Sequence, residues 1–114
     1  MSSTHIAHIT PIHLTTETGG EGVTRLTLAG ELDLDTVARI EPELMLVTAG
    51  GGTKVVLDLA GLTFCDTSGV KLLLRLHRRC AADGARLRLC HIPRRPGRVL
   101  RTLGVDRTIP CAFA

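Results

Sequence analysis

Thr63-Phe64-Cys65-Asp66-Thr67-Ser68-Gly69-Val70 decides the fold of this chain, because an apolar, strand-like run here gives way to small polar residues and then to a helical pattern. Asp66, Thr67 and Ser68 are residue types whose side-chain oxygens accept hydrogen bonds from the unpaired N–H groups at the start of a helix. We therefore expect a helix to begin here. The first turn of a helix favours a nearby anion by about 0.3–1 kcal/mol, so a phosphate would be well tolerated at this place.

The chain has the size and composition of one compact domain. It has 114 residues, of which 44% are apolar, and we expect residues 1–114 to form a single domain in which residues 1–10 are flexible or form an edge strand. The two aromatic residues, Phe64 and Phe113, indicate an aliphatic core without stacking platforms for nucleic-acid bases. The net charge of +3 is smaller than nucleic-acid binding usually requires. Since no leader or membrane-spanning run is found, we expect a cytoplasmic protein that contacts neither nucleic acid nor membrane directly.

The cysteines and histidines show no spacing typical of a metal site. The cysteines are separated by ten or more residues each, a pattern typical of buried, reduced thiols. We therefore predict no metal and no cofactor. These residues are Cys65, Cys80, Cys90 and Cys111, with His5, His8, His13, His77 and His91.

The residues before the central stretch predict a hairpin, a helix and a buried strand. Apolar and polar side chains alternate in 12–16 and again in 23–28, on either side of a glycine-rich turn, which predicts an amino-terminal hairpin. Asp35 or Thr36 is then expected to cap a helix. Pro42 lies within that helical pattern, so we expect either a kink or a main helix that starts near Glu41. The apolar run 54–59 is typical of a central strand in a parallel sheet.

The residues after the central stretch predict two more helices and two more strands. A helix is expected from Ser68 to Ala82, with Leu72 and Leu76 outside its core-facing side. Alternation in 85–90 predicts a strand toward an edge of the sheet, and 97–103 predicts a helix that ends at Gly104. A last short strand is expected within 105–113. The fold class is thus α/β, with a mixed sheet of four to five strands, an amino-terminal hairpin, parallel later strands and three covering helices.

Three motifs together resemble those of the STAS domain, the fold of anti-sigma factor antagonists and of the cytoplasmic ends of sulfate transporters. They are Gly30-Glu31-Leu32-Asp33, Val55-Val56-Leu57-Asp58-Leu59 and Phe64-Cys65-Asp66-Thr67-Ser68-Gly69-Val70. The segment from Val99 to Val105 is similar to the third helix of the family and the turn after it. The resemblance covers nearly the whole chain from Ile12 onward.

The resemblance implies that Ser68 is a phosphorylation site. In antagonists of this family, a partner that is both anti-sigma factor and serine kinase phosphorylates the serine at this place, and a serine phosphatase resets the switch. The unmodified form would bind that partner and free a sigma factor, whereas phosphorylation would release the kinase. The alternative interpretation is that Ser68 only caps the helix.

The residues around Ser68 carry similar pairs of interpretations. Asp66 is either the helix cap or a group that orients Ser68 for the kinase. Thr67 is a second phosphorylation site or a capping and packing residue, and Gly69 belongs to the motif. Asp33 is a solvated turn carboxylate or, by its position in the family, a residue that contacts the partner or takes part in the phosphorylation reaction. Leu72 is a peripheral packing residue or a partner-facing apolar spot.

Other roles remain open for the rest of the chain. Cys65 is a redox input or, preferably, a buried thiol. The cluster Arg94, Arg95, Arg98 and Arg101 is a solvated face, a docking surface for an acidic partner or, as the third alternative, a nucleic-acid contact. An enzyme with Ser68 as nucleophile is disfavoured, because Asp-Thr-Ser-Gly-Val is not a nucleophile-elbow motif. A further alternative is a STAS scaffold or regulatory subunit in a stress-sensing or lipid-transport complex.

Overall fold

The computed structural model describes residues 11–18, 20–50 and 52–114. The elements are β1 (Ile12–Thr18), β2 (Val23–Leu32), α1 (Leu34–Thr48), β3 (Lys54–Asp58), β4 (Leu62–Cys65), α2 (Thr67–Ala82), β5 (Arg86–Ile92), α3 (Arg94–Thr102), η2 (Val105–Arg107) and β6 (Cys111–Phe113). The expected edge strand or flexible segment at 1–10 lies outside the described residues.

The sheet is mixed, and its order is β1-β2-β3-β5-β6, with β4 paired to the far end of β2. Within the described ranges, β1–β2 is the one antiparallel pair, which confirms the amino-terminal hairpin. The pairs β2–β3, β2–β4, β3–β5 and β5–β6 are all parallel. The short strand β4 extends the sheet to six strands, and β5 lies next to the edge strand β6 as expected.

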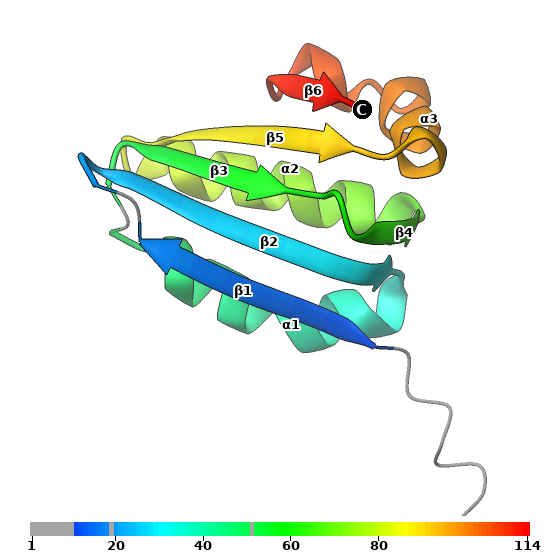
Figure 1. Ribbon diagram of the computed structural model, residues 1–114, viewed down its shortest axis with the longest axis horizontal. Helices are drawn as coiled ribbons and strands as arrows, with labels where there is room; N and C mark the ends of the chain where they lie inside the picture. Colours follow the sequence, from blue (N-terminus) through cyan, green and yellow to red (C-terminus); the bar gives the residue numbers. More distant parts are fainter. Residues whose placement is uncertain (1–10, 19, 51) are drawn as a thin grey trace, which may run out of the picture.

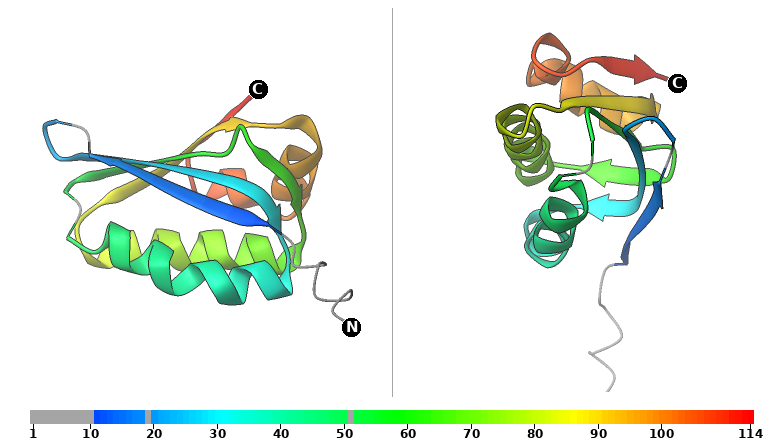
Figure 2. Two further views of the ribbon diagram at one scale, coloured as in Figure 1. Left: turned by 60° about the horizontal axis from the view of Figure 1, so that its bottom comes forward. Right: turned by 90° about the vertical axis from the view of Figure 1, so that its left-hand side faces the viewer.

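The helices α1 and α2 lie side by side against one face of the sheet and run in the same direction, so their amino termini lie at the same end (Figures 1 and 2). The third helix, α3, contacts β4 at that end. In the described part of the chain, no helix covers the opposite face of β2, β3 and β5, where Arg25, Arg86 and Arg88 are exposed.

The core lies between the sheet and the helices and is aliphatic, as the shortage of aromatic residues predicts. Buried leucines come from β2, β3 and β5 on one side and from α1 and α2 on the other. Leu28, Leu57, Leu89, Leu44 and Leu73 are each 0% exposed. Burial of this kind is the main stabilising contribution to folding, at about 25 cal/mol per Å² of apolar surface.

The helix α1 corrects two expectations. It is one helix with Pro42 inside it, so the alternative of a helix that starts near Glu41 is wrong. Pro42 is exposed, and water can therefore reach the carbonyl group that loses its intrahelical donor there. The cap is Asp33, rather than Asp35 or Thr36.

The buried side of α2 also differs from the expected one. Leu72 and Leu76 are both 0% exposed, whereas the helical pattern placed them outside the core-facing side. Because α2 packs on the sheet and also against α1, its buried side is rotated toward these two residues.

The helix α3 starts at Arg94, three residues earlier than expected. Gly104 directly follows the C-cap of α3 and has a φ of 74°, as predicted for a glycine that ends a helix.

Candidate functional site

The candidate site is built where the parallel strands β2 and β4 end together. Leu32 and Cys65 are partners in the register, and the Asp66 N–H donates to the Leu32 carbonyl oxygen over 3.1 Å. Each strand is followed by one aspartate, Asp33 or Asp66, which is the amino-terminal cap of α1 or α2. The two helix starts therefore lie next to each other, and both direct the positive ends of their dipoles to this corner of the molecule.

Asp66 is the residue that caps α2. Its Oδ1 accepts hydrogen bonds from the backbone N–H of Ser68 at 2.8 Å and of Gly69 at 3.3 Å. One carboxylate oxygen thus satisfies two of the four free donors at the helix start. This agrees with the capping interpretation of Asp66 and leaves a role in orienting Ser68 as a prediction.

Ser68 lies in the first turn of α2 and is half-buried. Its backbone N–H is held by Asp66, but its side chain does not cap the helix, so the interpretation of Ser68 as only a cap is wrong. Among the described residues, no protein partner is found for its hydroxyl group, and no histidine bonds to it. The neighbouring Thr67 is the first residue of α2 and is exposed.

Gly69 fixes how closely this turn packs on the sheet. It is buried, and a Cβ atom added there would lie 2.6 Å from Cys65 Sγ and 2.8 Å from Leu32 Cβ. Any larger residue would push the start of α2, and Ser68 with it, away from the strand ends. Gly69 therefore sets the height of Ser68 above the sheet and is itself out of reach of a partner.

Asp33 has a defined structural role that the sequence did not predict. Its Oδ1 accepts the Thr36 N–H over 2.9 Å, and its own N–H donates to Thr36 Oγ1 over 2.9 Å, which completes a capping box. The pKa of Asp33 is lowered, mainly by the hydrogen bond from the Thr36 backbone N–H. The carboxylate is therefore charged at neutral pH.

Two exposed apolar side chains lie beside these caps. Leu34 follows Asp33 and is 76% exposed, and Phe64 precedes Cys65 and is 45% exposed. Exposed apolar side chains at a helix start and near a strand end are available to a protein partner. Sequence reasoning named Leu72 for this role, but Leu72 is completely buried. The signal that could have found Phe64 is its place as one of two aromatic residues in the chain, directly before the polar turn.

The thiol of Cys65 lies beneath the site and has the properties of an unreactive, buried thiol. Its side chain is 3% exposed. Burial, with a smaller effect of the Asp66 charge, raises its pKa to about 12. A thiol with this pKa is protonated at neutral pH and reacts slowly, which agrees with the prediction of a buried thiol and weakens the redox interpretation.

The arginine cluster lies on α3, which contacts β4. Arg94, Arg98 and Arg101 line a hollow of about 400 Å³ together with Phe113, and the Arg101 guanidinium group stacks 3.9 Å from the centre of the Phe113 ring. Docking of an acidic partner on these arginines stays a prediction.

Among the described residues, the group with suitable atoms for a metal ion is Asp58, Cys90 and His91, which are in β3 and β5 rather than beside Ser68. The described helices include none with the length and apolar character needed to cross a membrane.

The chain resembles proteins of known family over most of its length. Residues 16–110 match the family model described as "Mlab, STAS domain". The anti-sigma-F factor antagonist RsfB of Mycobacterium tuberculosis is 38% identical over 52 residues, a match that covers 46% of this chain and 43% of that protein. This match therefore spans less than half the length of the curated relative.

Two solved structures share the fold. The crystal structure of an anti-sigma factor antagonist from Mycobacterium paratuberculosis superimposes with a TM-score of 0.79 at 22% identity, and the match covers 90% of this chain and 86% of that chain. The Bacillus cell fate determinant SpoIIAA in its phosphorylated form gives a TM-score of 0.63 at 25% identity, with coverage of 88% and 91%.

Proposed function

Since the chain belongs to the STAS domain family, we propose that it is an anti-sigma factor antagonist that acts in the cytoplasm and is regulated by phosphorylation of Ser68. The names of the relatives support the first part of this proposal, and the geometry at the start of α2 supports the second. In its unmodified form the protein would bind an anti-sigma factor with serine kinase activity and free a sigma factor. Phosphorylation would release the kinase, and a serine phosphatase would restore the binding form.

The observation that carries the proposal is that Asp66, and not Ser68, caps α2. Asp66 makes the capping hydrogen bonds of α2, so the Ser68 hydroxyl group can be modified without loss of a helix cap. The free N–H groups and the dipole of the helix favour an anion here. A phosphate at Ser68 should therefore leave the fold intact while it changes the charge of the surface.

The charge that phosphorylation adds is large enough to break a protein complex. It adds about −1.5 to −2 at pH 7, close to the carboxylate of Asp66. Two unit like charges about 4–5 Å apart repel by about 1 kcal/mol in water, but by about 3–4 kcal/mol at the effective dielectric constant of about 20 expected in an interface. The extra repulsion in the interface, relative to water, corresponds to a loss of about two orders of magnitude in affinity for the partner.

Leu34 and Phe64 are proposed to form the apolar part of the contact surface, with Asp33 and Thr67 at its polar rim. Both side chains are exposed: Phe64 directly precedes the strand end Cys65, and Leu34 is the first residue of α1, two positions after the strand end Leu32. A partner that binds there would approach the first turn of α2, which directly follows β4. This arrangement would make binding sensitive to the charge on Ser68.

The test is to compare the wild-type chain with Ser68→Ala and Ser68→Asp in binding to the anti-sigma factor recovered from cells with the native protein. Ser68→Ala should bind with nearly wild-type affinity and accept no phosphate, and Ser68→Asp should bind at least tenfold more weakly. Thr15→Asp is the matched control, because it adds the same charge at an exposed position of β1, outside the proposed contact surface. It should accept phosphate on Ser68 and affect binding less.

Peptide mass analysis of the segment that contains Ser68 should locate the phosphate in the native protein. If both Ser68 variants bind equally well, the switch proposal fails, and a scaffold role that does not depend on Ser68 is favoured. If Ser68 is labelled by a serine-directed inhibitor and ester substrates are cleaved without any kinase, the protein is instead an enzyme.

A further inference from the structure

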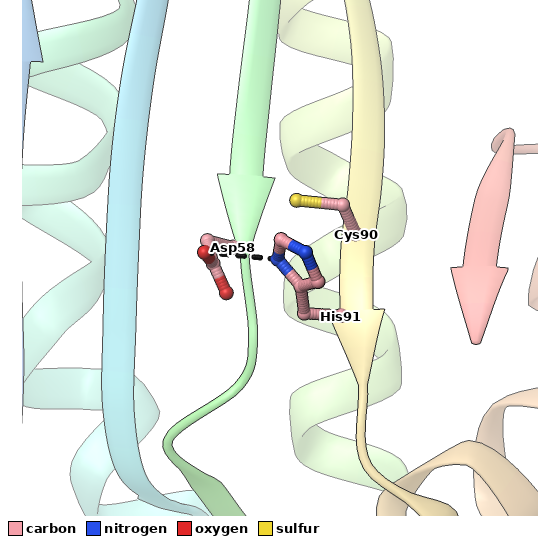
Figure 3. A group of neighbouring side chains, drawn as sticks. All are labelled: Asp58, Cys90 and His91. Carbon is pink, nitrogen blue, oxygen red and sulfur yellow. Dashed lines mark hydrogen bonds and ion pairs between the residues drawn. The ribbon is translucent and has the colours of Figure 1, made fainter. Parts of the chain in front are cut away.

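A cluster of three potential metal ligands lies on the open face of the sheet, formed by two neighbouring strands. Asp58, the last residue of β3, is paired in register with Cys90 of β5. Directly paired residues of adjacent strands point to the same side of a sheet. The carboxylate and the thiol therefore face the same side of the sheet, which is the side away from α1 and α2 (Figure 3).

His91 joins this pair because the backbone departs from regular strand geometry. Consecutive residues in a strand normally point to opposite faces, so His91 would be expected on the side of the helices. Its φ is 52°, in the left-handed region that non-glycine residues seldom adopt. The pairing of β5 with β6 is also irregular between Leu89 and Ile92. This irregularity turns the imidazole ring to the side of Cys90 and lets Ile92 return to the core, where it is 0% exposed.

The donor atoms are close enough to share one ion. Asp58 Oδ2 lies 3.1 Å from His91 Nδ1, and the oxygen, nitrogen and sulfur donors of the three residues all lie within 4.8 Å of one another. The other carboxylate oxygen of Asp58 accepts the backbone N–H of Ala60 over 2.9 Å. This bond orients the carboxylate in the way that outer hydrogen bonds orient metal ligands.

The surroundings leave room for an ion and for a further ligand. The cluster borders a hollow of about 220 Å³ that Glu17 and Arg25 also line. Arg25 disfavours a cation there, but the register of β1 and β2 places Glu17 directly opposite Arg25, and Asp58 adds a second carboxylate. The imidazole is largely exposed, so water can occupy a fourth coordination position.

We propose that Asp58, Cys90 and His91 form a binding site for a divalent transition-metal ion, with Zn²⁺ as the best match. One sulfur, one nitrogen and one oxygen donor are a set that Zn²⁺ accepts in tetrahedral geometry with water as the fourth ligand. Mg²⁺ and Ca²⁺ prefer oxygen ligands alone. Burial and the charge of Asp58 raise the pKa of the Cys90 thiol, so a bound metal would have to displace its proton.

The test measures metal binding directly and does not depend on the proposed function. Metal-free full-length protein is titrated with Zn²⁺ by calorimetry and with Co²⁺ in an absorption spectrometer. We expect one equivalent of Zn²⁺ to bind, and Co²⁺ to show the charge-transfer band of a cobalt–thiolate bond. Cys90→Ser should remove this band, and Asp58→Asn and His91→Asn should each weaken Zn²⁺ binding at least tenfold.

Matched controls separate this site from other thiols and imidazoles. Cys111→Ser and the exposed His13→Gln should leave both signals unchanged. Asparagine tolerates the left-handed region, so His91→Asn should fold, and thermal unfolding of each metal-free variant checks this. The proposal is overturned if Co²⁺ gives no thiolate band, if the three ligand variants bind Zn²⁺ like the wild type, or if His13→Gln abolishes binding. In those cases Asp58 and His91 only form a hydrogen bond at the surface.

Discussion

The carboxylate of Asp66 determines which side chains at the start of α2 are free. Because its Oδ1 accepts hydrogen bonds from the N–H groups of both Ser68 and Gly69, the hydroxyl groups of Thr67 and Ser68 are not needed to cap the helix. The small polar residues followed by a helical pattern predicted that a helix starts here, but three adjacent residues had suitable side chains. Which of them caps depends on backbone angles that the strand β4 and the packing of Gly69 impose, and one-dimensional patterns do not contain that information.

The thiol of Cys65 should be inert in the folded protein. Burial raises its pKa to about 12, so the thiol stays protonated at pH 8, and only the thiolate is nucleophilic. We expect iodoacetamide to modify Cys65 only after unfolding in guanidinium chloride, as peptide mass analysis of native and unfolded samples would measure. Cys90, which is less buried, serves as the internal comparison. Fast modification of native Cys65 would contradict this expectation and would restore the redox interpretation.

The site exists because α1 and α2 run parallel, which places their amino termini side by side. An ion pair between Glu41 and Arg75 links the two helices. Arg75 of α2 donates to both carboxylate oxygens of Glu41 of α1 at 2.7 Å each. The sequence predicted the existence of both helices, their order and the strand between them. It did not predict this pair, because the residues are 34 positions apart and no local pattern reports which helix faces meet.

Loss of the Glu41–Arg75 pair should destabilise the domain modestly and in a pH-dependent way. The hydrogen bonds from Arg75 lower the pKa of Glu41. The stabilising effect is therefore fully present above the ordinary glutamate pKa and is lost as the pH falls through the lower, folded-state pKa. Since both side chains are partly exposed, we expect Glu41→Gln to lower the free energy of unfolding by roughly 0.2–1 kcal/mol at pH 7.

Urea unfolding at several pH values measures this effect. The difference between wild type and Glu41→Gln should be constant from neutral pH down to the ordinary glutamate range and should shrink below it. Arg75→Gln should have a similar effect, and the double variant should lose less than the sum of the two. A difference that grows in acid would mean that another group is responsible.

At the scale of the whole molecule, α1 and α2 cover one face of the sheet, and no helix among the described residues covers the opposite face of β2, β3 and β5 (Figure 2). The motifs that resemble the STAS domain predicted this α/β fold and the position of Ser68 in it. They could not predict the hollow with Asp58, Cys90 and His91, because strand alternation assigns the last two residues to opposite faces. They also could not predict which apolar side chains stay outside, because burial of a helix face depends on how the other layer packs against it.

Leu72 is buried although the helical pattern placed it outside the core-facing side of its helix, whereas Leu34 is exposed, so their alanine variants should separate stability from binding. Leu72 is 0% exposed in the core, so Leu72→Ala should lower the free energy of unfolding by about 2–5 kcal/mol, the usual effect of such a cavity. Leu34 is 76% exposed, so Leu34→Ala should change stability by no more than about 0.5 kcal/mol. It should nevertheless weaken binding of the anti-sigma factor, because the interface would lose an apolar contact. Urea unfolding and calorimetric titration of both variants measure the two effects, and the contact surface beside Ser68 has been assigned wrongly if Leu34→Ala binds as well as the wild type.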